Sequence, residues 1–450
     1  MLFDNIGLKV PEIYMPRKGI DLYKWAVVAC DQFTSQPDYW EKAKRVIGDD
    51  PSTMNLIYPE VYLEDETVNG EQLINQINEN MHHYLRDGVL EKQKEGFVLI
   101  DRKTNHVKSR KGLVVALDLE KYDYNKGSTT LIRATEGTVL DRLPPRIKIR
   151  EKASVELPHI MVLIDDPDKT VIEPLFNESL EKLTDFELML DGGYIQTYRI
   201  DQPELLNQIA QRLGKLTSKE KMTDKYGSDS NGTLVYAMGD GNHSLATAKA
   251  IWEELKTNSD NKDGIMEHPA RYALVELVNV HDEGLNFEPI HRVVFDVNVD
   301  DLLARMKFYF EDRGSQLTQT LFPDVDAALK QFEDREKGTH EHVFAFVAKG
   351  MSGFMTVNNP RLNLDVGSLQ AFLDDYFTYN QEARVDYIHG ADVVSELGAK
   401  EGNMGFYLPC MAKQDLFKTV YLDGALPRKT FSMGEAEEKR YYLECRKIVA

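Results

Sequence analysis

The sequence contains only three cysteines, Cys30, Cys410 and Cys445, and they are widely separated. This number and spacing argue against a disulfide framework and against a zinc site built on paired cysteines. No apolar run approaches the roughly 18 residues of a membrane-spanning helix, since the longest runs, 112–117 and 342–348, have the length of single strands. The N-terminus lacks a basic segment followed by an apolar core, so no secretory signal is predicted. We therefore expect a cytoplasmic protein without a membrane partner.

Positive charge is also scarce, because the formal net charge is −20. The resulting long-range field repels phosphate polymers, which argues against a nucleic-acid partner. A small anionic substrate would need local arginines or lysines to reverse that field. The remaining composition, 42% hydrophobic and 28% charged, is typical of a globular protein. A chain of 450 residues is expected to form two or three domains, and it carries no signal for an oligomeric state.

Several well-known catalytic motifs are absent from the sequence. There is no P-loop, no H-E-x-x-H zinc helix and no G-x-S-x-G nucleophile elbow. The turn Gly239-Asp240-Gly241 resembles half of a dinucleotide fingerprint, but Ser244 stands where the third glycine belongs. An Asp inside that turn would also repel a pyrophosphate unless a cation intervened. Cys30 could be a nucleophile, but an unassisted buried thiol is the simpler interpretation.

The pattern of apolar residues predicts a mixed α/β protein. We expect an N-terminal domain over residues 1–295 that holds the active site, and a C-terminal α/β domain over 296–450. Helices are expected to begin near residue 37 and to cover 68–87, 203–213, 300–313 and 325–336. Strands are expected at 24–29, 96–101, 111–119, 159–164, 233–238, 269–280, 287–295, 343–348 and 353–357. The polar stretch 215–232 is predicted to be a mobile loop.

The junction between the strand at 233–238 and the following helix is the strongest candidate site. The strand stops at Gly239-Asp240-Gly241, and an alanine-rich helix pattern starts around His243 and Ser244. The glycines permit close approach of the backbone, and the N–H groups of a helix start can bind an anion. Alternatively, Asn242 or Ser244 is simply the N-cap of a surface helix.

Three further clusters are candidates. Glu136 lies beside Arg133 in Ile132-Arg-Ala-Thr-Glu-Gly-Thr138, and Arg142, Arg146 and Arg150 follow. Arginines at these positions could bind phosphate oxygens, or they could form ordinary ion pairs. The pair His291-Arg292 and the strand-end residue Asp31 complete the set.

These clusters together resemble the bacterial and archaeal family called domain of unknown function 1015. The sequence has, in order, a strand ending in Asp, Asn55-Leu-Ile-Tyr-Pro-Glu60, the Arg-x-x-Glu element, D-G-N-H-S-x-x-T-A and Pro289-Ile-His-Arg292. The resemblance also extends to Asp386-Tyr-Ile-His-Gly390 and Leu426-Pro-Arg-Lys429. It matches family positions to Asp31, Glu136, Asp240, Gly241, His243, His291 and Arg292. Departures are Ser244 for an arginine, Thr135 for a histidine and Ala29-Cys30 at the start of the first element.

The D-G-x-H core is also similar to that of the ParB/sulfiredoxin-type free-serine kinases. This resemblance implies a ParB/sulfiredoxin-like core and a phosphotransferase acting between ATP or ADP and a small hydroxyl metabolite, with free serine or O-phosphoserine the first choice. Glu136 would accept the hydroxyl proton and Asp240 would hold Mg²⁺. His243 would stabilise developing charge, and residues that would contact substrate or phosphate are Asp31, Arg133, Arg146, Gly239, Gly241, Asn242, Ser244, His291 and Arg292.

Two other functions stay open at this point. The chain could be a non-catalytic nucleotide-binding regulatory module, which the replacement of an arginine by Ser244 favours. It could also hydrolyse a phosphomonoester, with water in place of the hydroxyl acceptor.

Overall fold

A computed structural model of the chain describes residues 1–63, 65–138, 140–227, 229–336 and 338–449, without the side chains of Arg142 and Lys219. The chain forms two compact units, one of residues 1–285 together with 434–450 and one of residues 286–433. The sequence placed the boundary at residue 295 and assigned the C-terminus to the second domain. The difference arises because Arg446 and Lys447 pair with Glu156 and Val155 of the first unit.

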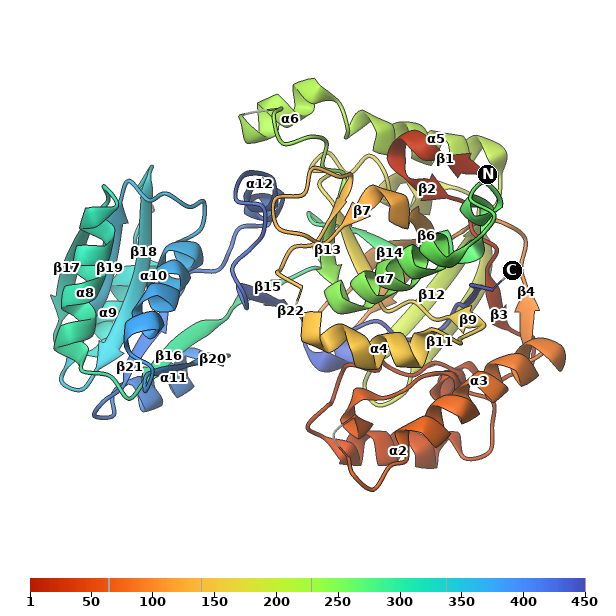
Figure 1. The fold of residues 1–450 in the computed structure, drawn as a ribbon, viewed down its shortest axis with the longest axis horizontal. Coiled ribbons are helices and arrows are strands. Elements are labelled where there is room, and N and C mark those ends of the chain that lie inside the picture. The colour runs from red at the N-terminus through yellow and green to blue at the C-terminus, as the bar shows by residue number, and fades with distance from the viewer. Residues whose placement is uncertain (64, 139, 228, 337, 450) are drawn as a thin grey trace. The chain divides into compact units, whose positions relative to one another are not determined.

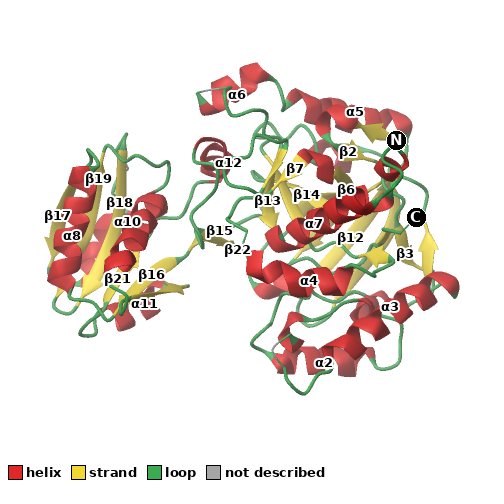
Figure 2. Ribbon diagram, viewed as in Figure 1, coloured by secondary structure: helices red, strands yellow, loops and turns green. Residues whose placement is uncertain are grey.

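A large mixed sheet forms the centre of the first unit (Figures 1 and 2). Its strand order is β11 (Glu181–Leu188), β12 (Gly193–Ile200), β5 (Phe97–Lys103), β6 (Arg110–Asp118), β14 (Tyr272–Asn279), β10 (Met161–Ile164), β13 (Tyr236–Asp240), β8 (Ile132–Arg133) and β7 (Tyr122–Asp123). The short strands β1 (Leu2–Phe3) and β2 (Leu8–Lys9) extend it beside β6. The predicted mixed α/β class is confirmed.

Both faces of the central strands are buried. Leu113, Val115 and Leu117 of β6 pack into one hydrophobic cluster, and Val114 packs into a second cluster. Successive side chains of a strand point to opposite faces, so each face contributes to a separate core. This explains why 111–119 reads as a continuous apolar run instead of alternating with polar residues.

Helices and two small ribbons surround this sheet. The helices of the first unit are α1 (Leu22–Trp25), α2 (Pro37–Ile47), α3 (Gly70–Arg86), α4 (Leu143–Arg150), α5 (Pro203–Lys215), α6 (Lys219–Tyr226) and α7 (Asn242–Asn258). The ribbons pair β3 (Tyr14–Pro16) with β4 (Leu90–Lys92) and β9 (Val155–Glu156) with β23 (Arg446–Lys447). Helix α4 packs beside α7 (Figure 1).

Two local expectations were wrong. The expected strand at 24–29 begins inside helix α1, whose N-cap Asp21 accepts a hydrogen bond from the backbone N–H of Tyr23. The expected loop at 215–232 contains α6, which starts after Ser218 and ends at Gly227 in a left-handed conformation. Ser218 and Gly227 cap the two ends of that short polar helix and stabilise it.

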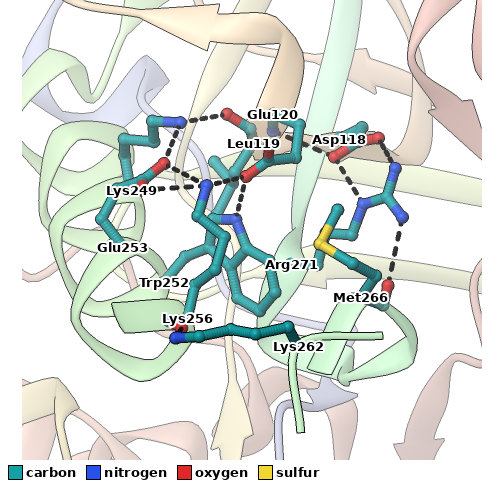
Figure 3. Close-up of polar contacts among 10 residues, drawn as sticks. All are labelled: Asp118, Leu119, Glu120, Lys249, Trp252, Glu253, Lys256, Lys262, Met266 and Arg271. Carbon is teal, nitrogen blue, oxygen red and sulfur yellow. Dashed lines mark hydrogen bonds and ion pairs between the residues drawn. The ribbon is translucent and has the colours of Figure 1, made fainter. Parts of the chain in front are cut away.

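A polar cluster fixes the position of α7 against the sheet (Figure 3). Lys249 of α7 donates to the Leu119 carbonyl at 2.9 Å, and Lys256 forms an ion pair with Glu120 at 2.6 Å. In the same cluster the fully buried carboxylate of Asp118 pairs with Arg271 at 2.6 Å. Because these contacts hold the middle and the end of α7, they also define where its N-terminus points.

The second unit is a smaller α/β fold. Its sheet has the order β17 (Gln316–Phe322), β19 (Met351–Asn358), β18 (Glu341–Ala348), β21 (Met404–Tyr407), β16 (His291–Phe295) and β20 (Arg384–Ile388), and β15 (Phe287–Pro289) pairs with β22 (Phe431–Met433). Its helices are α8 (Val299–Asp312), α9 (Val325–Glu333), α10 (Asp365–Tyr379), α11 (Ala391–Gly398) and α12 (Lys413–Leu422). Among the described residues of both units, no helix has the length and apolar character needed to cross a membrane.

Candidate functional site

The candidate site is built on the junction between β13 and α7. Strand β13 ends at Asp240, and Gly241 adopts a left-handed conformation with φ of 81° as the N-cap of α7. A side chain at position 241 would meet the Cα and Cγ1 atoms of Ile160 at 3.1 Å, so glycine is needed there. Asn242 and Ser244 lie inside the helix, and neither is its N-cap. The alternative in which Asn242 or Ser244 is the N-cap of this helix is therefore wrong.

Glu136 is brought to this junction by parallel strand pairing. Strand β8 pairs in parallel with β13, with Ile132 opposite Tyr236. The carboxyl ends of both strands therefore lie at the same edge of the sheet. Just beyond them the Thr135 N–H donates to the side-chain oxygen of Asn242 at 3.3 Å. The partly exposed Glu136, which follows Thr135, thus lies beside the first turn of α7.

The carboxylate of Asp240 is bound by a lysine from the C-terminal segment. One oxygen of Asp240 lies 3.0 Å from the ammonium of Lys439, and the other accepts the N–H of Gly241 at 2.9 Å. Burial alone would raise the pKa of Asp240, but the charge and hydrogen bond of Lys439, helped by His159, hold it below its usual range. Asp240 is therefore ionised at neutral pH.

Backbone pairing brings Asp31 to the same edge. The N–H of Ala29 donates to the Arg440 carbonyl, and the N–H of Tyr442 donates to the Val27 carbonyl, both at 2.8 Å. This antiparallel pairing places the residues after Ala29 beside the residues before Arg440. Asp31 then lies 4.0 Å from the ring of His159.

His159 connects three parts of the site. Its Nε2 lies 2.8 Å from the hydroxyl of Ser244, and its Nδ1 lies 2.7 Å from the hydroxyl of Tyr442. The Tyr442 hydroxyl also accepts the N–H of Cys30 at 3.1 Å. Each ring nitrogen of His159 therefore has a hydroxyl as its hydrogen-bond partner.

Glu60 and Arg146 form an ion pair next to this group. The guanidinium of Arg146 lies 2.5 Å from Glu60 Oε1, and both side chains are largely buried. Burial raises the pKa of Glu60 above its ordinary value, although the charge of Arg146 acts in the opposite direction. Glu60 and Arg146 line a cavity that Ser244 and His159 also line, as do Arg150 and its partner Glu156.

Arg133 and Arg150, two other members of the predicted cluster, are bound by groups of the protein itself. Arg133 is buried and donates to the backbone carbonyls of Thr130 and Asn231. Arg150 pairs with Glu156, and the side chain of Arg142 lies outside the described part of the chain. A role for Arg133 in phosphate binding stays a prediction.

His291 and Arg292 belong to the second unit. The ring of His291 accepts the N–H of Leu408 at 3.1 Å, and burial, reinforced by the Arg292 charge, lowers its pKa to about 4. Arg292 is fully buried and donates to Gln370 and to the Arg428 carbonyl. These contacts fix the positions of both side chains within the second unit. A contact of either residue with a substrate stays a prediction.

Sequence reasoning missed His159, Lys439 and Tyr442. The sequence predicts His159 to be the first residue of a strand, but strand β10 begins at Met161. Lys439 is the first cation after four residues that include three glutamates, a local reversal of charge that could have marked it. Its contact with Asp240 depends on the return of the C-terminus to the first unit, which no local pattern indicates.

The structure also limits how a metal could bind. Within the described ranges, no group of three or more His, Cys, Asp or Glu side chains could hold a metal ion. Asp240 is instead occupied by Lys439. A magnesium ion that arrives bound to nucleotide phosphates would need only one or two protein carboxylates.

Comparison with solved structures finds distant similarities. A mutant free serine kinase in complex with ADP has a TM-score of 0.38 and 12% identity, over 77% of this chain and 95% of the other. A conserved hypothetical protein from Pyrococcus furiosus has a TM-score of 0.35 and 12% identity, over 75% and 95%. SbnI from Staphylococcus aureus, truncated at its C-terminus, has a TM-score of 0.33 and 9% identity, over 71% and 82%.

No curated protein matches the chain in sequence. In contrast, the family whose description reads "Protein of unknown function (DUF1015)" matches residues 14–376. The expectation drawn from the order of the motifs is confirmed, and the chain belongs to the DUF1015 family.

Proposed function

We propose that the first unit is a phosphotransferase that moves a phosphoryl group between a nucleotide and a small hydroxyl metabolite. The observation that carries this proposal is the geometry at the start of α7. An ionised Asp240, the ammonium of Lys439 and the N–H groups of a helix N-terminus meet there, and Thr135, the neighbour of Glu136, donates to Asn242 of the first turn. Opposite charges arranged in this way suit a transferring phosphoryl group and a hydroxyl that must lose its proton.

Each residue has a definite role in the transfer. The hydroxyl oxygen of the acceptor forms a bond to the terminal phosphorus, and the bond from that phosphorus to the nucleotide oxygen breaks. The proton of the hydroxyl passes to the carboxylate of Glu136. Lys439 and the first turn of α7, including His243, stabilise the charge that develops on the phosphoryl oxygens. A magnesium ion bound with the nucleotide, with Asp240 as a protein ligand, would supply further neutralisation of phosphate charge.

Phosphorus NMR of the purified protein with magnesium and ATP or ADP tests this proposal, with L-serine as the first acceptor in a panel of hydroxyl compounds. We expect a new phosphomonoester resonance that requires both acceptor and protein. Asp240→Asn should abolish it. Asp185→Asn is the matched control, because Asp185 lies on β11, at the opposite end of the sheet order from β8 and β13. Binding of nucleotide without any turnover across the panel would contradict the proposal.

A second candidate is a nucleotide-binding regulatory module. One observation favours it: Ser244, which replaces the arginine expected at this position, is hydrogen-bonded to His159, so the mouth of α7 offers one cation fewer to a phosphate. The same NMR experiment separates the functions. A regulatory module binds nucleotide without chemical change, and a hydrolase releases inorganic phosphate in the absence of any acceptor.

A further inference from the structure

A cavity of about 130 Å³ lies in the first unit between α3, α4, α7 and the central sheet. Its walls are mainly apolar side chains that are themselves largely buried. They include Leu56, Ile77, Met81, Ile149, Val155 and Leu274. An apolar cavity of about 150 Å³ in a protein stays free of water and binds a molecule of the size of benzene. The cavity here is therefore large enough for an apolar group of roughly six heavy atoms.

The charged and polar side chains that line this cavity pair with one another. Glu60 pairs with Arg146, and Arg150 pairs with Glu156. His159 is hydrogen-bonded to the hydroxyls of Ser244 and Tyr442. The apolar walls offer no comparable partners to water. A ligand that fills this space thus gains most by bringing hydrocarbon and keeping its polar end near the hydroxyl of Ser244.

The cavity and the proposed phosphate site share the first turn of α7. Ser244 lines the cavity and lies one turn of helix after Asp240, whose carboxylate binds Lys439. His159 lines the cavity as well and contributes to the charge balance of Asp240. A molecule seated in the cavity would therefore present its polar end to the place where nucleotide phosphates are proposed to bind.

We infer that the acceptor is a hydroxyl compound with an apolar body of about six heavy atoms, such as an aromatic or branched aliphatic alcohol, which occupies this cavity. The inference rests on the proposed phosphotransferase function. It differs from the expectation of free serine, because serine has a single methylene beside its hydroxyl and would leave the apolar walls without contacts. In an apolar pocket one added methylene changes specificity by about tenfold or more.

Binding to the cavity is tested without nucleotide or turnover. Benzyl alcohol is the probe, and the protein carries isotope labels on the δ1 methyl groups of isoleucine. We expect shifts at Ile77, Ile149 and Ile160, which line the cavity, and none at Ile209, which is buried in the other core of the same unit. Glycerol at the same concentration should shift none of them. Absence of shifts with saturating benzyl alcohol overturns the inference.

Two variants fill the cavity and one serves as a matched control. Ala153→Leu and Ile149→Phe add volume to the wall, and Ala210→Leu adds the same volume to α5, away from the cavity. The first two should abolish the methyl shifts of the remaining isoleucines, and the control should keep them. If circular dichroism shows that one of these two variants is unfolded, the methyl shifts of the other variant test the inference. Unchanged shifts in a folded filling variant overturn the inference.

Turnover then separates this inference from the proposed function. With magnesium and ATP, apolar alcohols should exceed L-serine in kcat/KM by about tenfold or more, and Ala153→Leu should raise their KM without changing the nucleotide Kd. A preference for L-serine would overturn the inference and leave the phosphotransferase in place. Methyl shifts without turnover of any acceptor would overturn the phosphotransferase and leave a binding site for an apolar alcohol.

Discussion

Lys439 and Asp240, which are far apart in the sequence, form an ion pair of 3.0 Å at the start of α7. The lysine reaches Asp240 because the segment 434–450 returns to the first unit and pairs with residues 27–29. The site is therefore completed by the end of the chain. Residues from the segments 29–31, 159–160, 239–244 and 439–442 contact one another there.

Replacing Lys439 should weaken nucleotide binding. A hydrogen bond to a charged group contributes about 1.5–3 kcal/mol, which corresponds to about a 10- to 100-fold change in Kd. We expect Lys439→Met to lose affinity for magnesium-ATP in this range and Lys439→Arg to recover part of it, as measured by titration calorimetry. Lys182→Met is the control, since Lys182 is an exposed lysine on β11 that also pairs with an aspartate. Equal affinities of the wild type and Lys439→Met would exclude phosphate binding by this lysine.

Replacing Arg440 should strongly destabilise the first unit. Arg440 is buried and pairs with Glu276 and Glu444, which are also buried. Removing one partner of a buried ion pair costs about 3–5 kcal/mol, so Arg440→Met should lose about that much stability. All three tryptophans, Trp25, Trp40 and Trp252, lie in this unit, so urea unfolding followed by tryptophan fluorescence reports on it selectively. A loss below about 1 kcal/mol would show that the pair is not buried in solution.

The cost of losing Arg440 should also depend on pH. Burial alone raises the pKa of Glu276, but Arg440 and Arg110 outweigh it and hold the pKa below its ordinary value. In the wild type this stabilisation is present above the unfolded pKa of about 4.3 and is lost as pH falls through the folded value. In Arg440→Met the buried glutamate instead becomes easier to accommodate once protonated. The stability difference should thus be largest near neutral pH and shrink below about pH 4, and a difference that grows on acidification would contradict this account.

Replacing Asp118 should destabilise the polar cluster that holds α7 against the sheet. Its carboxylate is fully buried and accepts two hydrogen bonds from Arg271 and one from the N–H of Glu120 (Figure 3). We expect Asp118→Ala to lower the urea-unfolding free energy of the first unit by about 3 kcal/mol. Asp185→Ala, at a fairly exposed pair, should change it by less than about 1 kcal/mol. Similar losses in both variants would mean that the cluster does not anchor the helix.

The three cysteines should differ in reactivity. Burial and the neighbouring Asp31 raise the pKa of the Cys30 thiol far above its ordinary value, and Cys445 is fully buried. Cys410 is exposed. A chromogenic disulfide reagent at neutral pH should therefore modify Cys410 quickly and the other two only after denaturation. Fast modification of Cys30 in the folded protein would restore it as a candidate nucleophile.

Elements with strong periodicity were predicted well from the sequence. The helices expected at 68–87, 203–213 and 300–313 match α3, α5 and α8 within two residues at each end. The strand at 233–238 matches β13 except that β13 begins and ends slightly later. Asp240, Glu136 and Asp31 were selected as candidates from distinctive local residue types, and their roles stay predictions. These features depend on local sequence, which a single chain displays directly.

The missed features depend on contacts between distant segments. Lys439, His159 and Tyr442 reach the site only because 434–450 packs into the first unit and because β10 begins two residues after His159. The apolar cavity is formed by side chains of several separate segments, each of which reads as ordinary core in sequence. Local patterns therefore indicated the proposed phosphate site but gave no sign of the cavity beside it.

The most direct test of the central claim is the behaviour of Glu136→Gln, measured for turnover by phosphorus NMR and for magnesium-ATP binding by calorimetry. If Glu136 accepts the hydroxyl proton, turnover should fall by roughly a hundredfold or more, and the nucleotide Kd should stay within about threefold of the wild type. Turnover that is unchanged in Glu136→Gln, or a wild-type protein that binds no nucleotide, would contradict the account.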